Sequence, residues 1–75
     1  MEILKSVKRE TAKAVLSTVD ILIGGGIEQT TDIWLPKSQI TENKTTFEVP
    51  EWLISAKQKD LSASFGGNSV LIYAV

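Results

Sequence analysis

Residues 11–35 read TAKAVLSTVDILIGGGIEQTTDIWL, and the pairing of this segment is the first question about the fold. Two apolar segments, residues 11–23 and 31–35, lie on either side of a loop that begins with three consecutive glycines. In the second segment Ile33 and Leu35 share one face, and Trp34 takes the other. If the first segment is also a strand, the two segments form a wide hairpin closed by a long glycine-rich loop.

The first of these segments fits a strand and a helix about equally well. Its β-branched residues favour a strand, in which Ala12, Ala14 and Leu16 alternate with polar neighbours. After Ser17 the apolar phase shifts, as at a bulge or bend. A helix would instead gather one apolar face from Leu4, Val7, Val15, Leu16, Val19 and Leu22. Periodicity alone leaves both alternatives open.

Proline and glycine divide the rest of the chain into short pieces. Residues 45–49 alternate as in a strand, and Pro50 opens a short helix that turns Leu53, Ala56 and Leu61 inward. Residues 62–75 predict a final hairpin that turns at residues 66–68. Together the pieces predict one domain over residues 1–75. Its fold class is mainly β (α+β), a small partly open SH3/OB-like barrel or sheet of about five strands with one short helix.

The composition excludes several classes of function. The 75 residues include no histidine and no cysteine, which removes the commonest general base and the usual zinc ligands. A net charge of −1 is unlike that of a duplex-DNA or membrane-surface protein. The carboxylates are scattered without an acid–base or metal spacing. We expect a soluble, cytoplasmic protein without a signal peptide that is not an enzyme and has no cofactor and no metal site.

Three segments carry a resemblance to a known group of proteins. WLPKSQI at residues 34–40, EVPEWL at 48–53 and ETAKAVL at 10–16 resemble short phage, prophage and mobile-element proteins with a "WLPKSQI … VPEWL" signature. In that group a strand precedes the signature, so the resemblance favours strands over a helix near the N-terminus. The function of the group is mostly unknown, and the resemblance implies only a genomic setting, in the cytoplasm of a host cell. The loop over residues 24–32 is longer than the tight hairpin of the group.

Two polar and aromatic features are candidates for binding. Lys37, Ser38 and Gln39 follow Pro36, which marks an edge, a bulge or a strand end, and they lie beside Trp34. This set would stack a base and hold a phosphate, or else Ser38 and Gln39 satisfy backbone groups while Trp34 fills the core. Trp52 is either a lid on the core or an exposed interface anchor.

The basic residues of the N-terminal segment are a third candidate. On a strand, Lys5, Arg9 and Lys13 share a parity and line one face, which either is solvated or follows a nucleic-acid backbone. We expect a non-catalytic phage-type protein that binds a host protein or a protein–nucleic-acid complex, with inhibition of host defence or replication as one such role. The alternative is a single-stranded nucleic-acid-binding barrel that uses Trp34, Lys37 and the basic strand. A homodimer through residues 70–75 is compatible with either function.

Overall fold

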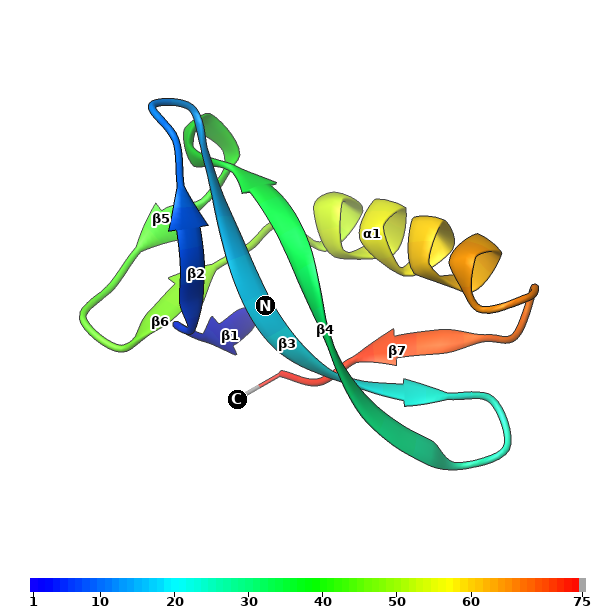
Figure 1. Ribbon diagram of the computed structural model, residues 1–75. Coiled ribbons are helices and arrows are strands. Elements are labelled where there is room, and N and C mark those ends of the chain that lie inside the picture. The colour runs from blue at the N-terminus through cyan, green and yellow to red at the C-terminus, as the bar shows by residue number, and fades with distance from the viewer. Residues whose placement is uncertain (75) are drawn as a thin grey trace.

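The computed structural model describes residues 1–74, which form two antiparallel sheets and one long helix (Figure 1). The large sheet has the order β2 (Val7–Glu10), β3 (Ala14–Ile23) and β4 (Ile27–Pro36). The small sheet has the order β1 (Glu2–Leu4), β6 (Thr46–Glu48) and β5 (Thr41–Glu42). The remaining elements are a 3-10 turn η1 (Lys37–Gln39), the helix α1 (Glu51–Ser64) and a last strand β7 (Val70–Ile72).

This architecture confirms the predicted mainly β fold with one helix. Strands β2 and β7 both pair with β3, and because β4 pairs with β3 along its whole length, they share the opposite edge of β3. Over residues 1–74 the two sheets do not close into a barrel. The N-terminal residues form strands, as the resemblance favours. Among the described residues no helix, α1 included, has the length and apolar content needed to cross a bilayer.

The β3–β4 hairpin is tighter than the sequence predicts. Its two strands stay in register from Ala14 opposite Pro36 to Ile23 opposite Ile27, so the loop contains only the three glycines. Gly25 and Gly26 have φ values of +90° and +86°, which favour glycine, and the Gly26 N–H donates to the Ile23 carbonyl at 3.1 Å. The predicted long loop is wrong because Ile27 and the polar residues 28–30 pair with β3 although both faces of this segment are exposed.

The core lies between one face of the large sheet, the small sheet and α1. The odd-numbered residues of β3 face it without interruption, because Ser17 is fully buried and keeps the phase between Val15 and Val19. The predicted phase shift in β3 is therefore wrong, and the irregularity lies in β2, between Val7 and Arg9. The buried apolar residues are Ile3, Val15, Val19, Ile21, Ile23, Ile33, Leu35, Phe47, Val49, Leu53, Ile54, Val70 and Ile72.

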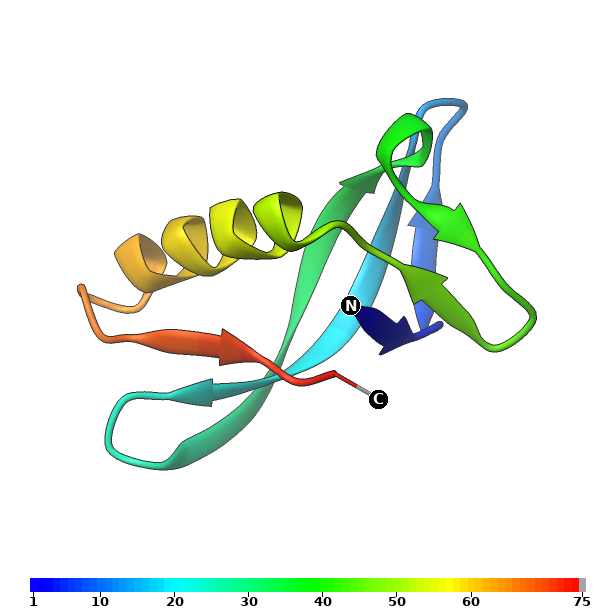
Figure 2. The same cartoon turned by 180° about the vertical axis from the view of Figure 1, so that it is seen from behind.

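The helix α1 is longer than predicted and replaces half of the expected C-terminal hairpin. Residues 55–64 contain no β-branched residue, glycine or proline, so the helix continues to Ser64. Gly66 and Gly67, with φ of +73° and +83°, then reverse the chain and lead it back along α1 into β7 (Figure 2). Ala56 is exposed and Ile54 is buried in its place, contrary to the prediction that Ala56 faces inward.

Candidate functional site

The most prominent exposed aromatic side chain of the sheet is Trp34. We call the side of the large sheet that faces away from the core the outer face. Trp34 lies on it, opposite Leu16 of β3, which in turn lies opposite Arg9 of β2. The Trp34 side chain is 42% exposed, so the interpretation that it fills the core is wrong. The three residues form a row across the sheet that offers an indole, an aliphatic side chain and a guanidinium to a partner.

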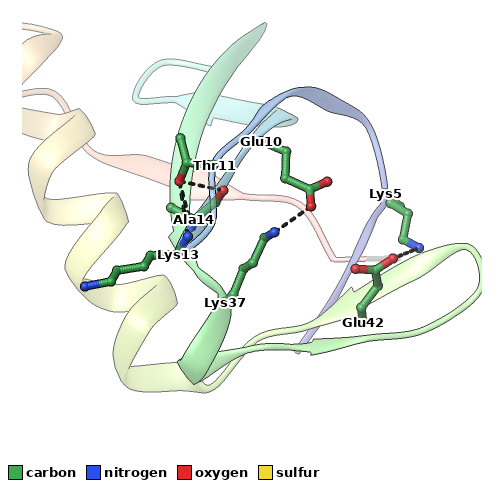
Figure 3. A network of polar contacts seen from close by, with 7 residues as sticks. All are labelled: Lys5, Glu10, Thr11, Lys13, Ala14, Lys37 and Glu42. Carbon is green, nitrogen blue, oxygen red and sulfur yellow. Dashed lines mark hydrogen bonds and ion pairs between the residues drawn. The ribbon is translucent and has the colours of Figure 1, made fainter.

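The residues that follow β4 do not complete a phosphate site beside Trp34. Lys37, Ser38 and Gln39 form η1, and the Lys37 ammonium makes an ion pair with Glu10 of β2 (Figure 3). Ser38 and Gln39 are exposed, and within residues 1–74 their side chains make no hydrogen bond. The interpretation that they satisfy backbone groups at the strand end is therefore wrong. Their side chains remain free to contact a partner.

The N-terminal basic residues do not lie on a single strand. Lys5 follows β1, Arg9 lies on β2 and Lys13 lies in the loop before β3. The Lys5 ammonium donates to Glu42 of β5 at 2.7 Å and lies 5.6 Å from the centre of the Phe47 ring. Hydrogen bonding to Lys5 and then its charge lower the pKa of Glu42. Lys5 thus faces the small sheet, whereas Arg9 alone joins the row of Trp34.

A small polar network of Thr18, Asp32 and Lys8 lies in the middle of the outer face. The Thr18 hydroxyl donates to Asp32 at 2.6 Å across the β3–β4 pair. The Lys8 ammonium approaches the other oxygen of the Asp32 carboxylate at 3.7 Å. Three of the lysines on or next to the large sheet, Lys5, Lys8 and Lys37, therefore already face carboxylates within the chain.

An acidic hollow of about 440 Å³ lies on the outer face, between this network and the β3–β4 turn. The Tyr73 hydroxyl donates to Glu28 at 3.1 Å. Partial burial, and then the hydrogen bond and charge of Glu28, raise the pKa of Tyr73. Asp20 and Glu28 have no ion pair within residues 1–74. The hollow is lined by Asp20, Ile21, Glu28, Gln29, Thr30 and Tyr73.

The candidate site residues predicted from the sequence do not include Asp20, Glu28 or Tyr73, which line the hollow. Asp20 and Tyr73 lie 53 positions apart and come together only because β7 docks on β3, where the Tyr73 N–H donates to the Asp20 carbonyl at 3.0 Å. Glu28 reads as a loop carboxylate in the sequence and becomes a strand residue in the structure. No local pattern connects these three positions.

The second tryptophan lies on α1, outside this face. Trp52 is 59% exposed, since the adjacent Leu53 and Ile54 take the buried positions of the first helical turn. The interpretation of Trp52 as a lid on the core is therefore wrong, and it remains a candidate interface anchor. Within the described part of the chain, no group of three or more acidic side chains is placed to hold a metal ion.

Comparison with known proteins yields no match to this chain, either among protein-family models, curated proteins or solved structures. The resemblance to the phage and mobile-element group stays a prediction.

Proposed function

We propose that this protein binds a partner macromolecule, a host protein or a protein–nucleic-acid complex, through the outer face of the large sheet. The observation that carries the proposal is the exposure of Trp34 in a row with Leu16 and Arg9. Tryptophan and arginine are the residues most enriched among those that dominate interface energies. A rigid sheet holds the row in place before the partner arrives, which lowers the entropic cost of binding.

The charges favour a partner with a protein surface over a bare nucleic-acid strand. Affinity for a phosphate backbone grows with the number of cations that replace its counterions. Lys5, Lys8 and Lys37 are engaged by carboxylates within the chain, and the outer face also carries Asp20 and Glu28. The resemblance to phage proteins supports a partner in the host cell, and inhibition of host defence or replication rests on that resemblance alone.

Affinity capture from a host-cell extract tests the proposal with a matched pair of variants. Trp34→Ala and Trp52→Ala each remove one exposed indole, from the sheet and from the helix respectively. We expect a partner that copurifies with the wild type and with Trp52→Ala but is lost with Trp34→Ala. Circular dichroism must show that both variants are folded. Equal recovery with Trp34→Ala would place the contact elsewhere and refute the proposal.

A single-stranded nucleic-acid ligand is the second candidate, favoured by the exposed Trp34 and by Arg9 in the same row. A base would stack on the indole while the guanidinium contacts a phosphate. Fluorescence anisotropy of a labelled single-stranded oligonucleotide at two salt concentrations measures this directly. Micromolar binding that weakens with salt and disappears in Trp34→Ala would replace the protein-partner proposal. We expect no binding, even at low salt.

A further inference from the structure

The strand β4 has a free edge along its whole length. It pairs with β3 only, and among the described residues no other strand joins it (Figure 1). The Lys37 N–H donates to the Lys13 carbonyl at 2.8 Å, one step beyond the end of the β3–β4 pair. Along an antiparallel pair, every second residue of a strand hydrogen-bonds to its partner strand. Since Lys37 bonds to the residue opposite it, the odd-numbered residues of β4 are the ones that bond to β3. The backbone groups of Glu28, Thr30 and Asp32 therefore point away from β3, as do those of Trp34.

On the opposite side of the sheet, the edge of β7 is closed by a side chain. On β7 the Ile72 N–H points away from β3 and donates to Gln58 of α1 at 2.9 Å. Val70 and Ile72 are buried and pair with Ile23 and Ile21. The predicted homodimer through residues 70–75 would have to displace Gln58, and residue 75 lies outside the described residues. Strands β1, β2 and β5 also lie at sheet edges but have four residues or fewer, so β4, with ten residues, offers the longest unpaired edge among the described residues.

We propose that the free edge of β4 binds an extended, basic segment of a partner protein, which adds to the large sheet as an antiparallel strand. The proposal rests on the proposed function and names its binding mode and its partner class. A strand with open N–H and C=O groups is a template for such addition, and native proteins normally shield it. On β4 the only such protection is Pro36 at the end of the strand, and no strand or helix among the described residues pairs with the edge formed by residues 28–34.

The charges next to the edge define the chemistry of the added strand. Glu28 and Asp32 of β4 lie on the outer face with Asp20 of β3, and among them only Asp32 has a lysine nearby, at 3.7 Å. Residues of the partner directly opposite Asp32 and Glu28 are four positions apart and share one face. Lysine or arginine at both positions would compensate the two carboxylates. The basic residue opposite Glu28 would also extend toward the hollow that contains Asp20 and Tyr73.

A second copy of the chain fits this edge less well than a basic segment. Antiparallel pairing of two β4 strands would collect Glu28 and Asp32 of both copies on one face, a total of four carboxylates. Each copy contributes only Lys8 against them, and each chain carries a net charge of −1. Like charges on neighbouring strands are destabilising. Charge complementarity therefore selects a basic partner.

Binding of a designed peptide to the purified protein tests this proposal. The probe is a fluorescent, end-blocked octapeptide TKVTVKVT, whose lysines are four residues apart on one face. Its controls are TEVTVEVT, which reverses the charge, and TKVTVKVT N-methylated at the threonine between the lysines, which keeps the charge and blocks one backbone hydrogen bond. We expect saturable binding of the first peptide, and binding weaker by about tenfold or more for each control.

Variants of Thr30 separate edge pairing from simple attraction between charges. The Thr30 N–H lies at the free edge, so Thr30→Pro removes a donor from the edge and none from the β3–β4 ladder. Thr30→Val keeps the donor and serves as the control, and circular dichroism verifies that both are folded. We expect Thr30→Pro to weaken binding about tenfold or more, with Thr30→Val close to wild type. A folded Thr30→Pro that binds like wild type, or equal binding of both charge types, overturns strand addition.

Two further outcomes distinguish this proposal from the proposed function. If no peptide binds while the extract still yields a partner that depends on Trp34 but not on the Thr30 N–H, strand addition is wrong and the proposed function stands. If Trp34→Ala retains every partner, the proposed function itself is wrong. A wild type that dimerises in sedimentation, with Thr30→Pro monomeric, assigns the edge to a second copy and overturns the basic partner.

Discussion

The contact between α1 and β7 provides a sensitive test of the fold. Gln58 accepts the Ile72 N–H at 2.9 Å through its side-chain oxygen, and Ile72 is only 3% exposed. Because this N–H points away from β3, no strand can take over as its acceptor. Gln58→Met keeps the length of the side chain and removes the acceptor, so the variant isolates the hydrogen bond from the packing of the aliphatic stem.

The expected loss follows from leaving a buried donor without a partner. Removal of one partner of a buried hydrogen bond costs about 1–3 kcal/mol. Native domains have roughly 0.05–0.15 kcal/mol of stability per residue, which for 75 residues gives about 4–11 kcal/mol in total. The substitution therefore removes a sizeable share of the free energy of unfolding. With a urea dependence of about 1 kcal/mol per molar, the unfolding midpoint falls by about 1–3 M.

Urea unfolding followed by circular dichroism measures this loss, and amide hydrogen exchange locates it. We expect faster exchange at Ile72 than in the wild type, together with the lower midpoint. Lys59→Met, one position along α1 at an exposed site, is the control and should stay within about 0.5 kcal/mol of the wild type. An unchanged midpoint and an unchanged Ile72 exchange rate for Gln58→Met would refute the docking of α1 on the edge of β7.

Three further predictions concern the core, the hairpin turn and a surface ion pair. Phe47→Ala empties a fully buried position and should lower the free energy of unfolding by about 3–5 kcal/mol in urea titrations, where a loss below about 1 kcal/mol would contradict the assigned core. Gly26→Ala places a side chain at φ +86° and should cost about 1–2 kcal/mol by thermal unfolding, with Gly26→Asn less affected; equal losses would argue against a left-handed turn. Because Lys5 lowers the pKa of Glu42, the ion pair contributes to stability above pH 4.5, and this contribution is lost as the pH falls through the lowered pKa. Glu42→Gln should therefore flatten the acid side of a plot of stability against pH. An unchanged slope would contradict the ion pair.

The sequence predicted those elements whose signal is local. Alternation marks the second half of β4 and the strand β6, the glycines mark the two chain reversals, and Pro50 followed by an acidic residue marks the start of α1. Pro36, predicted to mark an edge or a strand end, is the last residue of an edge strand. The sequence failed where a strand is exposed on both faces, as in residues 27–30, because apolar alternation arises only from burial on one side.

In the candidate site, too, the sequence identified residues by type but not their surroundings. The sequence singled out Trp34, Lys37 and Arg9, because aromatic and basic residues are informative in themselves. Whether Trp34 filled the core depended on the phase of β4 relative to β3, and the charge available at Lys37 depended on the position of Glu10. The hollow between Glu28 and Tyr73 has no local signature, since these two residues lie 45 positions apart in the sequence.

From the sequence alone come the class of the fold, the positions of the two glycine reversals and the absence of histidine and cysteine side chains. Backbone preferences and composition act over a few residues and need no knowledge of distant neighbours. The burial of Ser17 and the long free edge of β4 become visible only in the tertiary structure. These features depend on which segments far apart in the sequence pair with β3, and that choice is made by the burial of the whole apolar set.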